Sequence, residues 1–199
     1  QTVGGKPAGR VQLVLNMMGD RVDEPILELT DRRLLLLDKD GCVEPFPPAS
    51  DRDYLPQPPT AAAFDFCCNE FWWVSTYVAK GLWRDELPYA HELLEETLRK
   101  ELHKMLVWRI GVRTDFAVSP GKLGKYFKRL LEPQLWEQWQ QTCAEGSIDA
   151  HWEALDAMCR LFRTVAQEVA GHFGYVYPQG DDERVTAYLQ QGREAVTGT

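Results

Sequence analysis

The sequence predicts a mainly α-helical protein, in which a helical bundle follows a short β segment. After Thr60, apolar residues recur at helical intervals and strand patterns are almost absent. Before residue 44, short apolar runs alternate with turn residues, as they do in strands. Between these parts lies a proline-rich stretch that can continue neither a helix nor a central strand. We therefore divide the chain into a short β region (1–43), a linker (44–60) and a helical domain (61–199).

The β region contains two candidate strands. Val11–Leu15 is an apolar run, and Gly19-Asp20 forms a turn before a second extended stretch, Val22–Leu29. A single hairpin is only marginally stable in water, so these strands need further support.

The helical domain is expected to contain several helices with recognisable ends. Pro88 and Pro133 suit the first position of a helix, Ser147 is a good N-cap, and Gly174 ends the helix that Ser147 opens. We expect Gly192 and the polar residues after it to form a frayed tail. The expected helices are Ala61–Trp83, Pro88 to about Ile110, Lys122–Leu131, Pro133–Cys143, Ile148–Phe173 and a last one from Asp181.

Composition excludes several classes of protein. With 44% hydrophobic and 11% aromatic residues, the 199-residue chain is expected to fold. A net charge of −8 argues against a nucleic-acid partner. No apolar run approaches the roughly 20 residues that span a bilayer, so we expect no membrane partner and a cytoplasmic protein. The five cysteines and four histidines show no spacing typical of a disulfide framework or a metal site.

One helix face combines charges with aromatic rings. Its residues recur at three- and four-residue steps: Glu70, Trp73, Tyr77, Lys80 and Arg84. Carboxylates beside tryptophans suit a cationic aminoglycoside, and a lysine suits nucleotide phosphates. The alternative is that the tryptophans belong to an ordinary core and that Glu70 and Lys80 are solvated or paired with each other.

Several segments of the chain resemble one known family. They are Asn69–Ala90, Leu102–Trp108, Thr114–Ser119, Gly121-Lys122, Gly124–Phe127, Leu161–Ala166 and Asp181–Thr186. In order and spacing they resemble the aminoglycoside 6-adenylyltransferases, the streptomycin-modifying family, over roughly Leu36 to Gln190.

The resemblance implies a particular domain organisation. Members of this family have an N-terminal mixed-sheet nucleotidyltransferase domain, in which a Gly-Ser motif and a pair of aspartates hold magnesium and ATP. A helical domain then closes the aminoglycoside cleft. Neither motif precedes Val11 here, so the resemblance implies that residues 1–43 are a remnant of that α+β domain. Gly19-Asp20-Arg21-Val22-Asp23 resembles the family's Gly-Asn-Arg-Ile-Asp, which places Asp23 in or near the general-base position, although Glu24-Pro25 departs from the family's continuation.

The resemblance also implies a reaction and its partners. AMP would pass from ATP, with Mg²⁺, to a hydroxyl of an aminoglycoside antibiotic such as streptomycin. We expect little activity from these residues alone, and a monomer or weak homodimer. The implied catalytic residue is Asp23; the implied antibiotic-binding residues are Glu70, Trp73, Tyr77, Trp83, Asp85 and Glu86; the nucleotide contacts are Lys80, Lys122 and Lys125; no metal ligand is assigned.

Two other functions stay open at this point. The chain could be a non-catalytic helical module that binds or senses a cationic small molecule. It could also be a degenerate remnant that folds but binds nothing.

Overall fold

The computed structural model describes residues 2–3, 6–7, 15–16, 33–34 and 55–197. The chain forms two compact units, Gln1–Leu55 and Pro56–Thr199. The boundary between them falls within the proline-rich stretch. Among the described residues, no helix is both long and apolar enough to cross a membrane.

Two short antiparallel pairs make up the described part of the first unit. β1 (Thr2–Val3) pairs with β2 (Lys6–Pro7), and β3 (Leu15–Asn16) pairs with β4 (Arg33–Leu34). Apart from Leu15, the expected strands lie outside the described residues, and so does Asp23. The descent of this unit from a nucleotidyltransferase sheet stays a prediction.

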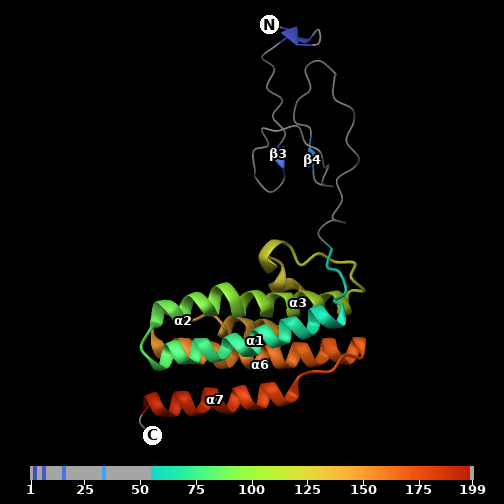
Figure 1. Cartoon of the computed structure of the whole chain (residues 1–199). Coiled ribbons are helices and arrows are strands. Elements are labelled where there is room, and N and C mark those ends of the chain that lie inside the picture. Colours follow the sequence, from blue (N-terminus) through green and yellow to red (C-terminus); the bar gives the residue numbers. More distant parts are fainter. Residues whose placement is uncertain (1, 4–5, 8–14, 17–32, 35–54, 198–199) are drawn as a thin grey trace. The chain divides into compact units, whose positions relative to one another are not determined.

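The second unit is helical, which confirms the mainly α fold class (Figure 1). Pro88 lies in the first turn of a long helix, as expected, but this helix is interrupted by one π-helical turn, η2, between α2 and α3. The elements are α1 (Ala61–Trp83), α2 (Leu87–Leu93), η2 (Leu94–Leu98), α3 (Arg99–Arg113), the 3₁₀ turn η3 (Lys122–Gly124), α4 (Phe127–Leu130), α5 (Pro133–Gln141), α6 (Ile148–Phe173) and α7 (Gln179–Thr197).

Local capping explains why α1 and α6 have the expected bounds. The Thr60 hydroxyl accepts a hydrogen bond from the Ala63 amide at 3.1 Å, and Ser147 does the same for Ala150 at 3.2 Å. Gly174 adopts a left-handed conformation (φ 71°) at the end of α6, which a glycine takes up without strain. These signals are local, so the sequence alone reveals them.

The core lies where α1, α3 and α6 pack together. The Phe71 ring of α1 stacks on Phe162 of α6 with centroids 3.8 Å apart, and Trp72 meets both rings edge-on. Leu102 and Met105 of α3 are also fully buried in this cluster. α7 lies along α1 and contacts α6 as well (Figure 1).

The expected frayed tail after Gly192 is wrong, because α7 continues to Thr197. Gly192 lies against Trp152 of α6, where an added Cβ would come 3.4 Å from the indole ring. Arg193 donates a 2.6 Å hydrogen bond to Asp156 of α6. The partners that order this polar end are distant in the sequence, so its local composition gave no sign of them.

Candidate functional site

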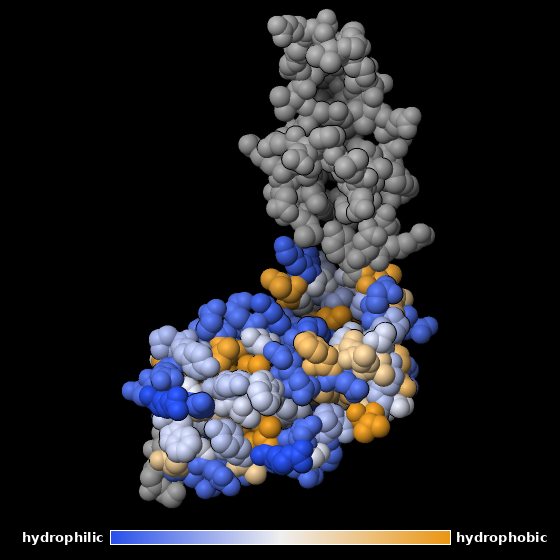
Figure 2. All heavy atoms as spheres, viewed as in Figure 1, coloured by the Kyte–Doolittle hydropathy of each residue, from blue (hydrophilic) through white to orange (hydrophobic). Residues whose placement is uncertain are grey.

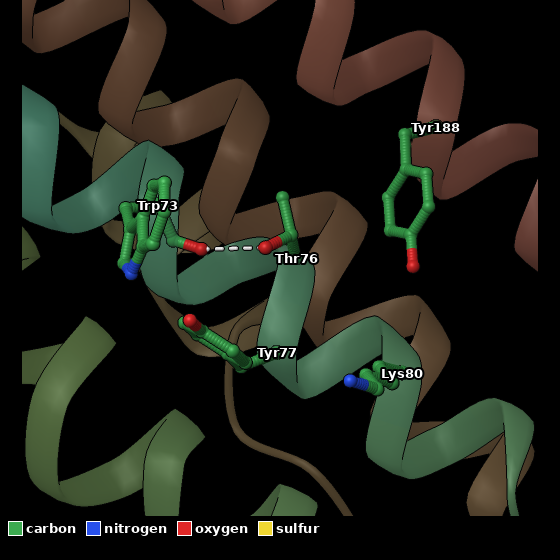
Figure 3. A pocket seen from close by; sticks show the side chains of 5 residues that line it. All are labelled: Trp73, Thr76, Tyr77, Lys80 and Tyr188. Atoms are coloured by element: carbon green, nitrogen blue, oxygen red, sulfur yellow. Dashed lines mark hydrogen bonds between the residues drawn. The ribbon is translucent and has the colours of Figure 1, made fainter.

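The polar-aromatic face of α1 is exposed, as the sequence pattern suggested. The Trp73 side chain is 59% exposed, Tyr77 is half-buried and Lys80 is exposed. The rings of Trp73 and Tyr77 meet at a steep angle, with centroids 5.8 Å apart. Trp73, Tyr77 and Lys80 project from successive turns of α1 (Figure 3). The alternative in which Trp73 belongs to the core is therefore wrong for this residue, although it holds for Trp72.

Helix α7 supplies the opposite wall. Tyr188 points its hydroxyl toward α1 (Figure 3) and, with Trp73, Thr76, Tyr77 and Lys80, lines a pocket of about 340 Å³. A second pocket of about 420 Å³ is lined by Lys80, Trp83, Arg84 and Tyr188. The two pockets share Lys80 and Tyr188, so they form one open groove. We call it the α1/α7 groove; its lining residues are Trp73, Thr76, Tyr77, Lys80, Trp83, Arg84 and Tyr188.

The groove combines aromatic rings with positive charge. Lys80 and Arg84 are its charged lining residues, and neither pocket includes a carboxylate. Such a surface favours an anionic ligand with a flat ring, because the cations attract phosphate while the aromatic faces stack on a base. A polycationic antibiotic lying along the same groove would be repelled by both charges.

Predicted acidic residues lie beside the groove rather than in it. Glu70 is partly exposed on α1, one turn before Trp73. Asp85 and Glu86 are exposed in the turn between α1 and α2, next to Trp83, which is 51% exposed. The Glu86 amide donates to the Gly81 carbonyl at 2.9 Å, and Asp85 adopts a positive φ of 60°. This tight turn presents two carboxylates and an indole to solvent, a combination that suits a cationic sugar.

The other two predicted nucleotide contacts lie elsewhere. Lys122 begins η3 and Lys125 follows it, and η3 packs against α3. The Lys125 ammonium lies 4.8 Å from the centroid of the Tyr126 ring. Neither pocket that Lys80 lines includes Lys122 or Lys125, and in Figure 1 the η3 and α4 segment lies beyond α3 while α7 lies beyond α1. The structure therefore does not bring the three predicted lysines together.

Sequence reasoning missed a histidine pair and the contribution of α7. His91 Nδ1 of α2 lies 3.0 Å from His151 Nε2 of α6, and His151 Nδ1 donates to the Ser147 carbonyl at 2.7 Å. In the neutral pair, His91 Nδ1–H is then the donor. No group of three or more potential metal ligands occurs in the part of the chain that the structure describes. No local signal could have found either feature, because the partners are far apart in the sequence.

Buried cysteines are poorly suited to nucleophilic chemistry. Burial raises the pKa of Cys68 and of Cys159 to about 12, and it raises the pKa of Cys67 further. A thiol with such a pKa stays protonated near neutral pH. These cysteines contribute packing to the core.

Comparison with known proteins identifies the family. The family model described as streptomycin adenylyltransferase matches residues 9–192. Aminoglycoside 6-adenylyltransferases from Campylobacter jejuni and from Bacillus subtilis strain 168 are 41% and 38% identical to 78% of this chain. The match covers 54% and 55% of those proteins, so the chain spans about half the length of the curated relatives it matches.

A solved structure supports the same relationship. The crystal structure of an aminoglycoside 6-adenyltransferase from Bacillus subtilis is 37% identical and superposes with a TM-score of 0.64. The match covers 82% of this chain and 60% of that one. The chain therefore belongs to the streptomycin adenylyltransferase family, the aminoglycoside 6-adenylyltransferases.

Proposed function

We propose that this chain provides the helical, substrate-binding side of an aminoglycoside O-adenylyltransferase, which transfers AMP from ATP to a hydroxyl of an antibiotic such as streptomycin. The observation that supports it best is the α1/α7 groove, where exposed aromatic rings lie beside two cations. The α1 wall of this groove belongs to the segment, Asn69–Ala90, with the most distinctive family sequence.

The groove is the proposed nucleotide contact. Lys80 and Arg84 attract the phosphates, and Trp73 or Tyr77 stacks on the adenine. Stacking of one base on an aromatic side chain contributes about 1–3 kcal/mol. Lys122 and Lys125, on the other side of α3, are proposed as separate phosphate contacts.

The antibiotic is proposed to bind at the acidic end of the same helix. Asp85 and Glu86 would pair with its amino or guanidinium groups, and Trp83 would cover an apolar sugar face. Glu70 is proposed as a further carboxylate on α1. This arrangement separates the two substrates by charge, since the cationic part of the groove would attract ATP and the acidic turn would attract the antibiotic.

In the proposed reaction, the antibiotic hydroxyl attacks the α-phosphate of ATP. A new O–P bond forms, the bond between the α-phosphate and the bridging oxygen breaks, and pyrophosphate leaves with the electron pair. The hydroxyl proton passes to a carboxylate, for which Asp23 is the candidate. The described residues contain no cluster suited to Mg²⁺, so we assign none of them to that ion. Our expectation that these residues alone transfer little AMP can be tested by pyrophosphate release.

Calorimetric titration with ATP, and separately with streptomycin, tests the division of the surface. Lys80→Ala should weaken ATP binding by about tenfold and leave streptomycin binding unchanged, because loss of one phosphate contact amounts to about 1.4 kcal/mol. Lys80→Arg keeps the charge and serves as the matched control. The Asp85→Asn/Glu86→Gln variant should show the opposite selectivity.

Failure of the wild-type chain to bind either compound would contradict the proposal. Binding of streptomycin alone, with Lys80→Ala unchanged, would instead favour a module that binds or senses a cationic molecule.

A further inference from the structure

A buried polar cluster fixes the start of α7. Asp182 is only 1% exposed, and both of its oxygens are bonded to the Arg163 guanidinium of α6, at 2.6 and 2.5 Å. Tyr177 donates to the same carboxylate at 2.7 Å and Thr186 at 3.0 Å. Burial acts to raise the pKa of Asp182, but these hydrogen bonds outweigh it and hold the pKa below its usual value. The carboxylate is therefore ionised and fully bonded.

This cluster determines how α7 is rotated about its own axis. A guanidinium that holds a carboxylate with two parallel hydrogen bonds accepts it in one orientation. Thr186, one turn later, also accepts a hydrogen bond from Arg163 at 2.9 Å. At the far end of α7, Arg193 bonds to Asp156 of the same helix α6. Rotation of α7 by one residue, about 100°, would break these contacts.

Tyr188 lies between these two attachments. Leu189, the next residue, is buried in the core, so the rotation that buries Leu189 also turns Tyr188 toward α1 (Figure 3). The Arg163 guanidinium also lies 5.7 Å from the centroid of the Trp72 ring, next in sequence to Trp73 of the groove. The cluster thus links the two walls of the groove through α6.

We propose that Tyr188 is a nucleotide-binding residue and that Arg163 and Asp182 are positioning residues that hold it in the groove. This inference rests on the proposed function, because it assumes that the α1/α7 groove takes ATP. It assigns Tyr188 to the wall facing Trp73 and Tyr77, with its ring or hydroxyl in contact with the nucleoside. It also gives the polar start of α7 a role that stability alone would not require.

Calorimetric titration of the whole chain with ATP tests the proposal. Tyr188→Ala should weaken binding about five- to tenfold, which is within the range for loss of an aromatic contact to a base. Asp182→Asn keeps the shape but weakens the attachment, so it should weaken binding several-fold under conditions where the variant is folded. Combined with Tyr188→Ala, it should add almost nothing, because both changes remove the same contact. If Asp182→Asn fails to fold, Thr186→Val removes one hydroxyl from the cluster and replaces it.

Arg109→Gln is the matched control for a general loss of stability. It breaks ion pairs to Glu132 and Glu168, away from α7, and should leave the affinity for ATP unchanged. The proposal is overturned if Tyr188→Ala binds ATP normally, or if Asp182→Asn loses stability but keeps full affinity. If the wild-type chain binds no ATP, the proposed nucleotide groove itself fails, and this inference fails with it. The wild-type titration therefore separates the two kinds of failure.

Discussion

Two neighbouring tryptophans of α1 lie in opposite environments. Trp72 is 1% exposed and packs edge-on against Phe71 and Phe162, whereas Trp73 is 59% exposed and lies in the α1/α7 groove beside Tyr77. Adjacent helical residues point about 100° apart, so one helix can serve both the core and a binding surface. Changes on the buried face should therefore reduce stability, and changes on the exposed face should reduce binding.

The largest expected effect comes from the buried face. Phe162→Ala removes the ring that stacks on Phe71 and should lower the free energy of unfolding by about 3–5 kcal/mol. Trp73→Ala, the matched change on the exposed face, should alter it by no more than about 0.5–1 kcal/mol. Urea denaturation measures both. Equal losses from the two variants would show that the faces are not separated as described.

A smaller effect is expected at the ion pairs that join α3 to the neighbouring segments. Arg109 is 5% exposed and bonds to Glu132 at 2.7 Å and to Glu168 at 2.6 Å. Arg109→Gln should cost about 1.5–3 kcal/mol, because it removes charge-assisted hydrogen bonds from a buried group. Lys100→Gln, which removes an exposed pair with Glu96, should cost less than about 1 kcal/mol. The comparison fails if the exposed pair matters as much as the buried one.

The pH dependence of stability should reveal His103. Burial between Phe127 and Trp139, together with the positive charge of Arg99, lowers its pKa to about 4. Between pH 6.5 and 4, the unfolded chain takes up a proton that the folded chain does not, so stability falls as the pH falls through this window. The loss should be about 1–2 kcal/mol, because the ring keeps part of its solvent contact.

His103→Gln should remove that component of the pH dependence. Urea midpoints measured for both proteins from pH 7 to pH 4 provide the test. A variant with the same pH profile as the wild type would contradict the assignment to His103.

The smallest effect is expected at the N-cap of α1. Thr60→Ala removes the hydroxyl that accepts from Ala63 and should cost about 1 kcal/mol. Thr60→Ser keeps the acceptor and should cost less. Thermal denaturation distinguishes the two variants. Since the cap precedes both faces of α1, neither variant should change ligand affinity in the folded state.

Features with local signals were predictable from the sequence, and features made by distant contacts were not. The bounds of α1 and α6 follow from Thr60, Ser147 and Gly174, each of which acts within one turn of itself. The exposed face of α1 follows from three- and four-residue spacing. By contrast, the ordered end of α7 depends on Trp152 and Asp156, which lie about 40 residues earlier in the sequence.

The candidate site divides in the same way. Trp73, Tyr77 and Lys80 could be grouped from the periodicity of one helix. Tyr188 could not, because only packing of α7 on α1 brings it to the groove. The spacing of Lys122 and Lys125 also gave no indication that they lie apart from Lys80, since their place depends on η3 packing against α3.

The central claim is that ATP binds in the α1/α7 groove. Photo-crosslinking with an azido-adenine ATP analogue, followed by peptide mapping, tests it most directly. Labels should appear on the α1 peptide that contains Trp73 and Tyr77 and on the α7 peptide that contains Tyr188, and excess ATP should suppress them. Labelling confined to the segment around Lys122 and Lys125, or labelling that ATP does not suppress, would contradict the claim.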